Sequence, residues 1–245
     1  MNSKIRAGVV VFPGSNCDQD MVDALSYYSN MEVCKLWHKS SNLENCQLII
    51  LPGGFSYGDY LRSGAIARFS PIMAEIIRFA ASGGFVFGVC NGFQILCESH
   101  LLPGALLHNN SHQFICENVS LVPVSMRSAI TASLRKDRTY KIPIAHGEGR
   151  YYASREVLDD LRGNDQILFR YSSAEGATTT EFNPNGALEN IAGVSNRNMN
   201  VFGMMPHPER AADELLGNTD GRLILNSLLG NLFGEEVLKL HSVSM

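Results

Sequence analysis

Continuous apolar runs, rich in β-branched residues, alternate with segments of helical periodicity through the first hundred residues. Several runs end at glycine or proline, as strands buried on both faces of a parallel sheet do. The predicted strands are residues 5–12, 31–37, 47–51 and 85–89. The predicted helices are residues 18–29, residues 71–81 and a helix that starts near Phe93. This alternation favours an open, doubly wound α/β sheet.

The second half of the chain has a different pattern, with several predicted strands and few helices between them. These strands are residues 114–124, 141–145, 166–171, 191–195 and 201–205. Residues 173–186 are polar and predict a long surface loop, and residues 220–233 predict a closing amphipathic helix. The pattern predicts a single domain over residues 1–245: a mainly parallel sheet with antiparallel additions.

Composition narrows the class of protein. Apolar residues make up 45% and charged residues 18% of the 245 positions, so a packed core is expected and general disorder is excluded. The net charge of −4 provides no basic excess for nucleic acid. No apolar run approaches the length of a membrane span. From the net charge and the short apolar runs together, we expect neither nucleic-acid nor membrane binding.

Six cysteines are present without a C-x-x-C pair, so we expect no metal site, free thiols and a cytoplasmic location. Cys17 and Cys46 fall in or beside predicted loops, where a thiol can be exposed. Cys34 and Cys116 fall in predicted strands. Cys97 lies within a predicted helix and is expected to be buried.

Residues 88–94, Gly-Val-Cys-Asn-Gly-Phe-Gln, follow a predicted strand and lead into a predicted helix. They match the nucleophile-elbow pattern, in which a sharp turn presents a reactive side chain and only small residues fit two positions away on either side. The helix N-terminus favours the thiolate over the thiol. The pattern indicates that Cys90 is a nucleophile rather than a buried cysteine after a strand.

A cysteine nucleophile requires a base and a group that orients the base. His207 stands between two prolines, which hold the segment extended and bring His207 and Glu209 to one side. We therefore predict a Cys90–His207–Glu209 triad. His146 also follows a strand and precedes a carboxylate, Glu148, but the surrounding glycines suit a substrate or partner loop equally well. The other five histidines follow no such pattern, and most are expected on the surface: His38, His100, His108, His112 and His241.

Acyl transfer also requires an oxyanion hole of backbone N–H groups. The N–H of Asn91 follows the nucleophile directly. Gly53 and Gly54 end the preceding buried strand, at the edge of the sheet where Cys90 is expected, and the pattern does not choose between them. No P-loop or dinucleotide-binding motif is present, so any ATP chemistry would belong to another chain.

Five segments in this order resemble those of the glutaminase subunits of phosphoribosylformylglycinamidine synthase, a family of class I glutamine amidotransferases. They are residues 12–18, 52–62, 88–94, 146–149 and 205–210, and the resemblance extends over residues 4–235. It implies a flavodoxin-like fold and the hydrolysis of L-glutamine through a cysteinyl thioester. By the same resemblance, Gln94, Asn109 and Phe114 line the glutamine pocket.

The resemblance also implies partners. Short chains of this family work with a separate synthetase subunit and a small bridging subunit. ATP and magnesium are then expected on the synthetase, with no cofactor bound by this chain. The ammonia would pass along a protected route to formylglycinamide ribonucleotide.

Two other readings remain open at this stage. A cysteine hydrolase of similar fold could act on peptides or γ-glutamyl bonds, and would need no partner. A non-catalytic binding or regulatory module would tolerate the loss of Cys90 or His207, and the presence of both counts against it.

Overall fold

The computed structural model describes residues 4–241, and a nine-stranded sheet runs through it in the order β2-β1-β3-β4-β11-β10-β9-β6-β7. The first five strands in this order pair in parallel. They are β2 (Met31–Trp37), β1 (Ile5–Val11), β3 (Leu48–Leu51), β4 (Phe85–Val89) and β11 (Val201–Met204). β3 and β4 are buried on both faces almost throughout, which explains their continuous apolar sequences.

The other strands extend the sheet by antiparallel pairing, beginning at β11. They are β10 (Ile191–Ser195), β9 (Ile167–Ser172), β6 (Ile115–Pro123) and β7 (Tyr140–His146). A separate antiparallel pair is formed by β5 (Ala105–Leu107) and β8 (Arg150–Tyr152).

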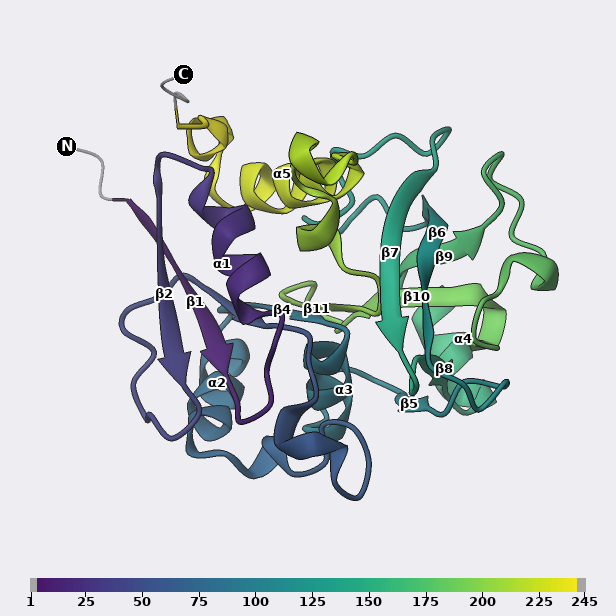
Figure 1. Cartoon of the computed structure of the whole chain (residues 1–245), viewed down its shortest axis with the longest axis horizontal. Helices are drawn as coiled ribbons and strands as arrows, with labels where there is room; N and C mark the ends of the chain where they lie inside the picture. The colour runs from purple at the N-terminus through teal and green to yellow at the C-terminus, as the bar shows by residue number, and fades with distance from the viewer. Residues whose placement is uncertain (1–3, 242–245) are drawn as a thin grey trace.

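Helices cover both faces of the parallel half of the sheet, as Figure 1 shows. α1 (Asp18–Ser26) and α5 (Asp220–Phe233) lie on one face, and α2 (Pro71–Ala81) and α3 (Asn91–Glu98) lie on the other. α4 (Arg155–Gly163) lies beside the antiparallel half. None of the helices in residues 4–241 has the length and apolar character to span a bilayer.

The predicted fold class is confirmed, and the longer predicted strands and helices agree with the observed ones within a few residues. The sequence pattern did not indicate β5, β8 or α4. β5 and β8 have three residues each, which is too short for an alternation of apolar and polar residues to be recognised. α4 buries Leu161 and packs the partly buried Val157 and Leu158 against the core. Ser154 accepts a hydrogen bond from the amide of Val157 as its N-cap.

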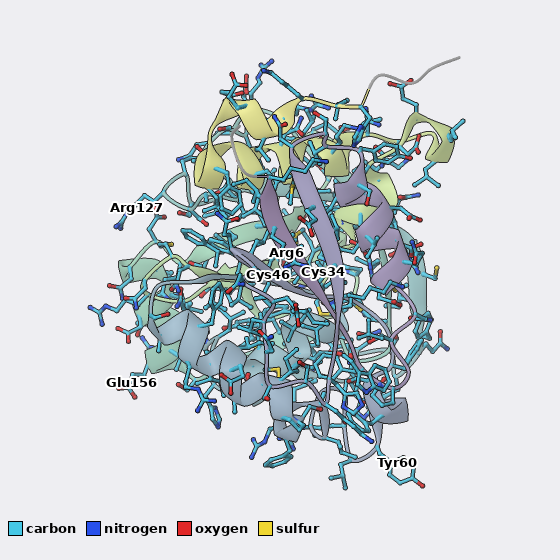
Figure 2. All side chains as sticks on the ribbon, turned by 90° about the vertical axis from the view of Figure 1, so that its left-hand side faces the viewer. Arg6, Cys34, Cys46, Tyr60, Arg127 and Glu156 are labelled. Carbon is cyan, nitrogen blue, oxygen red and sulfur yellow. The ribbon has the colours of Figure 1, made fainter. Side chains whose placement is uncertain are left out.

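The sequence left open whether the thiols of Cys17 and Cys46 are exposed. Cys17 and Cys46 are buried, and burial raises the pKa of each thiol to about 12. The Cys46 sulfur lies 3.5 Å from that of half-buried Cys34, and Figure 2 shows the two side by side. The exposed thiol is that of Cys116, while Cys97 is buried as predicted. His38 is also buried, with Nδ1 2.8 Å from the Tyr57 hydroxyl, whereas the other four unassigned histidines are exposed.

The start of α3 packs directly on the end of β3. A Cβ atom added to Gly92 would lie only 1.9 Å from the carbonyl oxygen of Leu51. No side chain fits there, so glycine lets the helix approach the strand this closely. This contact sets the position of the residue that precedes α3, which is Cys90.

We predict that Gly92→Ala lowers the free energy of unfolding by about 1–3 kcal/mol or more, because the added methyl group must displace backbone rather than a flexible side chain. Urea denaturation followed by circular dichroism measures the change. Gly163→Ala is the matched control, since a Cβ at Gly163 in α4 meets no atom within 4 Å. Equal stability of the two variants would contradict the role assigned to this contact.

Candidate active site

Three neighbouring parallel strands bring the predicted catalytic segments to one edge of the sheet. β4 leads into Cys90, and its neighbours β3 and β11 lead into the Pro52–Gly54 and Met205–Glu209 segments. Leu51 pairs with Gly88 and Met204 with Val89, so the three strands end almost level. The convergence predicted from sequence therefore follows from strand order.

Cys90 occupies a strained turn between β4 and α3. Its backbone has φ 51° and ψ −108°, a conformation that residues other than glycine rarely adopt. A Cβ at Gly88 would lie 2.7 Å from the backbone of Gly92, so the turn requires glycine on both sides. The thiol is nearly buried, with its sulfur 3.6 Å from the carbonyl oxygen of Ala145.

His207 and Glu209 form a fully buried hydrogen-bonded pair. Nδ1 of His207 lies 2.6 Å from Oε1 of Glu209, and the side chains are 1% and 0% exposed. The backbone N–H of His207 donates to the carbonyl of Pro143 in β7, which anchors the segment to the antiparallel half. Within the described residues, Nε2 of His207 and Oε2 of Glu209 have no hydrogen-bond partner.

The electrostatics favour a protonated imidazole. Burial alone would lower the pKa of His207, but the Glu209 carboxylate and the neighbouring Cys90 raise it to about 10. At neutral pH His207 therefore carries a proton on each ring nitrogen. Nδ1–H donates to Glu209, and Nε2–H remains available on the side of Cys90.

The thiol of Cys17 lies close to the His207–Glu209 pair. Its sulfur, a ring nitrogen of His207 and a carboxylate oxygen of Glu209 all lie within 4.8 Å of one another. Among the described residues 4–241, these three side chains have ligand atoms close enough together to hold a metal ion. Arg210 donates to the Cys17 sulfur at 3.1 Å and to Asp20 at 2.9 Å.

The two glycines proposed for the oxyanion hole have different surroundings. Gly53 packs against the His207 ring, because a Cβ there would lie 2.6 Å from Cε1. Gly54 lines a pocket beside Cys90 and has φ 139°. Asn91 is the first residue of α3, so its N–H has no acceptor inside the helix.

The pocket beside Cys90 has a volume of about 140 Å³. Its walls come from the segment after β3, the start of α3, the loop around His108 and the turn after β7. The residues that line it are Gly54, Phe55, Asp59, Ser63, Cys90, Gln94, His108, Phe114, Ala145, His146, Gly147 and Glu148.

The three residues expected to bind glutamine occupy different positions. Gln94 lines the pocket, but its amide is held by Asn91 and donates to the carbonyl of Glu148 at 2.6 Å. Phe114 lies at the mouth, half exposed and close to Phe55. Asn109 is fully buried and is not among the lining residues.

Asn109 instead supports the turn that carries His146. Its amide donates to the carbonyl of His146, and its oxygen accepts from the N–H of Gly149 at 3.0 Å and from Nδ1 of His146 at 3.1 Å. Nδ1 of His146 therefore carries the ring proton. Burial and the nearby His207 cation lower the pKa of His146 to about 4, so it is a neutral residue of the pocket wall.

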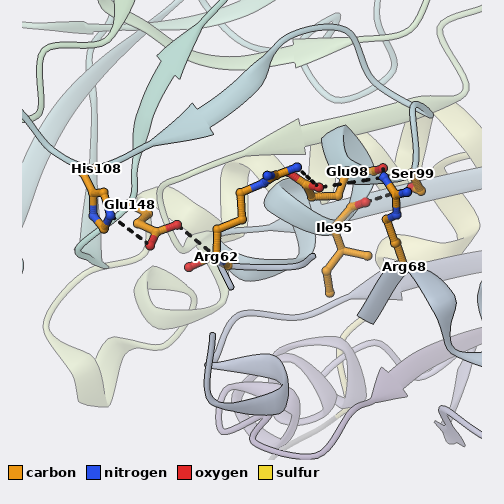
Figure 3. A network of polar contacts seen from close by, with 8 residues as sticks. Arg62, Arg68, Ile95, Glu98, Ser99, His108 and Glu148 are labelled. Atoms are coloured by element: carbon orange, nitrogen blue, oxygen red, sulfur yellow. Dashed lines mark hydrogen bonds and ion pairs between the residues drawn. The ribbon is translucent and has the colours of Figure 1, made fainter. Parts of the chain in front are cut away.

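Two carboxylates, those of Asp59 and Glu148, are among the groups that line this pocket. Glu148 accepts from the N–H of Ser63 at 3.1 Å and lies 3.7 Å from His108 (Figure 3). Arg62 pairs with Glu98 at 2.6 Å. Burial, assisted by the charge of Glu148, raises the pKa of Asp59 to about 6. No lysine or arginine is among the lining residues, so the pocket suits a ligand with a positive group.

Asp59, Ser63 and His108 had no role assigned from sequence, and the role of Glu148 was open. Asp59 lies in a loop with positive φ at Tyr57, Gly58 and Asp59, so its side-chain direction follows no strand or helix period. The available signal was the density of aspartate, glycine and aromatic residues after β3.

We predict that Glu209→Gln lowers the pKa of His207 from about 10 toward or below the ordinary value of 6.5, because burial then outweighs the remaining attraction. NMR titration of histidine side chains measures this change. Asp213→Asn, a change of the same kind at a partly exposed position nearby in the chain, should leave the His207 pKa unchanged. A His207 pKa that is the same in all three proteins would contradict the electrostatic account.

Comparisons with known proteins show the family of this chain. Residues 4–222 match the model of the CobB/CobQ-like glutamine amidotransferase domain. Phosphoribosylformylglycinamidine synthase subunit PurQ of Salinibacter ruber is 53% identical over 93% of this chain and 97% of its own length. PurQ of Chlorobaculum parvum is 53% identical over 94% of this chain and 91% of its own.

A solved structure resembles the whole fold. A chain in the structure of PurLQS from Thermotoga maritima superposes with a TM-score of 0.83 at 44% identity, covering 94% of this chain and 99% of that one. The chain therefore belongs to the CobB/CobQ-like glutamine amidotransferase family and, within it, to the PurQ subunits of phosphoribosylformylglycinamidine synthase.

Proposed function

We propose that this chain hydrolyses L-glutamine at Cys90 and supplies the ammonia to a synthetase partner. The observation that carries the proposal is the buried His207–Glu209 pair. Nε2 of His207 has no hydrogen-bond partner in residues 4–241 and lies on the side of a strained cysteine. A nucleophile, a base and a group that orients the base are the parts that amide hydrolysis through a thioester requires.

The first half of the reaction forms a glutamyl thioester. The Cys90 thiolate attacks the side-chain amide carbon of glutamine, and the N–H groups of Gly54 and Asn91 stabilise the oxyanion. Nε2–H of His207 then protonates the departing nitrogen, and ammonia leaves. Glu209 holds the imidazolium in position throughout.

The second half releases glutamate. His207, now neutral at Nε2, takes a proton from water as the water oxygen attacks the thioester. The intermediate collapses, glutamate leaves and the Cys90 thiolate forms again. In this mechanism Gly54 donates to the oxyanion, and Gly53 provides room for the His207 ring.

The two pocket carboxylates support glutamine as the substrate rather than a peptide. Asp59 and Glu148 suit the α-ammonium group of a free amino acid, which a glutaminyl residue inside a peptide lacks. The small pocket volume agrees with a substrate of this size.

The family supports a proposal for the partners, and the cysteines support one for the location. Because the homologous chain belongs to PurLQS, we propose a PurL-type synthetase and a PurS-type small subunit as partners, with ATP and magnesium on the synthetase. Six unpaired thiols suit a reducing cytoplasm. Since one sheet includes strands from both halves, we also propose that residues 1–245 act as a single domain.

Cys90→Ala should abolish glutamine hydrolysis and leave synthesis driven by added ammonia nearly intact in the reconstituted complex, because only the ammonia supply is removed. Cys116→Ala, at the exposed thiol, is the control and should leave both activities unchanged. Loss of both activities in Cys90→Ala would show that Cys90 holds the assembly together instead.

Glu148→Gln should raise the KM for glutamine about tenfold or more with a smaller effect on kcat, since hydrogen bonds to charged groups contribute about 1.5–3 kcal/mol. Glutaramate, which lacks the α-amino group, should be hydrolysed equally poorly by both proteins. Glu156→Gln, on the exposed side of α4, is the control (Figure 2).

The pair of carboxylates proposed to bind the α-ammonium group, Asp59 and Glu148, also predicts a pH dependence of the KM for glutamine. Asp59 loses its charge as the pH falls through about 6, so the KM for glutamine should rise below that pH. Asp59→Asn should raise KM and remove this rise. A KM that neither substitution changes would exclude the carboxylates from the α-ammonium subsite.

A further inference from the structure

The side chain of Asn91 is buried among the elements that form the substrate pocket, and the proposed mechanism uses only its backbone N–H. It is 1% exposed. Its Oδ1 accepts from the N–H of Ser56 at 3.2 Å. Its Nδ2 donates to Oε1 of Gln94 at 2.9 Å and to Oδ1 of Asp59 at 3.4 Å. One amide therefore connects α3 to the loop of residues 55–61, which carries Asp59.

The direction of these hydrogen bonds is fixed by a backbone group at each end of the series. The N–H of Ser56 can only donate, so it takes the oxygen of Asn91. The carbonyl of Glu148 can only accept, so it takes the Gln94 amide at 2.6 Å and leaves Oε1 of Gln94 for Asn91. Position 91 must therefore offer an acceptor on one side and donors on the other. An amide meets both demands, whereas an apolar side chain of similar size meets neither.

The loop that Asn91 contacts is strained. Tyr57, Asp59 and Leu61 have φ of 55°, 52° and 70°. Residues other than glycine adopt this region at a cost in free energy, and such conformations persist where surrounding contacts hold them. The tip of the loop supplies no such contacts, because Tyr60 is 75% exposed and Leu61 is 88% exposed (Tyr60 is labelled in Figure 2). The base of the loop must therefore hold it in place.

Two groups of side-chain contacts are found at this base. In one, the Tyr57 hydroxyl lies 2.8 Å from Nδ1 of His38 and 3.0 Å from the hydroxyl of Ser70, and none of the three residues lines the pocket. In the other, Asn91 contacts the loop at Ser56 and at the Asp59 carboxylate.

The second group is the one that reaches a carboxylate of the pocket wall. The Ser63 side chain also hydrogen-bonds Asp59, but it belongs to the same segment and does not tie that segment to α3. The position of the Asp59 carboxylate relative to α3 therefore depends on Asn91.

We propose that Asn91 is a positioning residue for substrate selection. Its amide holds the Asp59 carboxylate where the α-ammonium group of glutamine binds, and so sets the preference for free glutamine over amides that lack this group. The inference rests on the proposed function, which assigns Asp59 to the α-ammonium group. Through Gln94, the same amide also supports the backbone of Glu148, the second carboxylate residue of that subsite.

The test compares kcat/KM for glutamine with kcat/KM for glutaramate in the reconstituted complex. Asn91→Leu should lower the ratio of the two values about tenfold, mainly through the KM for glutamine, because leucine holds neither Asp59 nor Ser56. A change in the chemistry at Cys90 affects both substrates alike and cancels in the ratio. Asn91→Ala removes the same hydrogen bonds with less bulk, so it should lower the ratio in the same way and replaces Asn91→Leu if that variant does not fold.

Asn200→Leu is the matched control. Asn200 is 4% exposed, and its amide also holds backbone, donating to the carbonyls of Ala80 and Gly84 at 2.8 Å. It precedes β11, at the opposite end of that strand from His207. Its substitution should lower the free energy of unfolding and leave the substrate ratio unchanged. An equal fall of the ratio in both variants would give Asn91 a merely structural role and overturn the proposal.

A double substitution shows whether Asn91 acts through Asp59. In the Asp59→Asn protein, adding Asn91→Leu should change the ratio by less than about twofold, because the group that Asn91 positions has already lost its charge. Losses that multiply in the double variant would overturn the positioning role.

Glutamine binding to a complex that carries Cys90→Ala separates this inference from the proposed function, since binding requires no hydrolysis. Adding Asn91→Leu should weaken the binding measured by calorimetry about tenfold. Unchanged affinity would overturn the role of Asn91 even where wild type hydrolyses glutamine. If the wild-type complex hydrolyses no glutamine, the proposed function fails, while the affinities still decide whether Asn91 shapes the subsite.

Discussion

The contact between Gly92 and the Leu51 carbonyl sets the geometry on which the site depends. It draws the start of α3 against the end of β3, so the chain must leave β4 and enter α3 within a single residue. That residue is Cys90, and its positive φ is the result. The strain is tolerated because the glycines on both sides accept the close packing, and the sulfur is thereby directed to the edge where β3, β4 and β11 end.

Electrostatics at this edge follow from burial. His207 and Glu209 have almost no exposed surface, so their charges stabilise each other without competition from solvent. Burial would otherwise leave the imidazole neutral, as it does at His146 nearby. Two histidines at similar depth thus take opposite protonation states, because only one has a carboxylate partner.

Much of the fold could be predicted because its buried parallel strands leave a continuous apolar signal, and parallel pairing places their carboxyl ends together. The triad could be proposed because Cys90 and His207 lie directly after β4 and β11. Asp59 and His108 could not be proposed as site residues. They lie in irregular loops, where no strand or helix periodicity indicates the direction of a side chain. Asn109 shows the limit of carrying a role over by resemblance: it lies next to the pocket in sequence, but its side chain holds the His146 turn together. The burial of Cys17 and Cys46 could not be predicted, because loops over a large sheet can be buried as deeply as strands.

In the proposed mechanism the glutamyl group of glutamine becomes covalently attached to Cys90. Acid quenching of the complex during glutamine turnover, followed by peptide mass mapping, tests it most directly. We expect a glutamyl group on the peptide that contains Cys90, none on peptides with the other five cysteines, and none when glutaminase turnover has ended. A glutamyl group on another residue, or its persistence in the Cys90→Ala protein, would contradict the account.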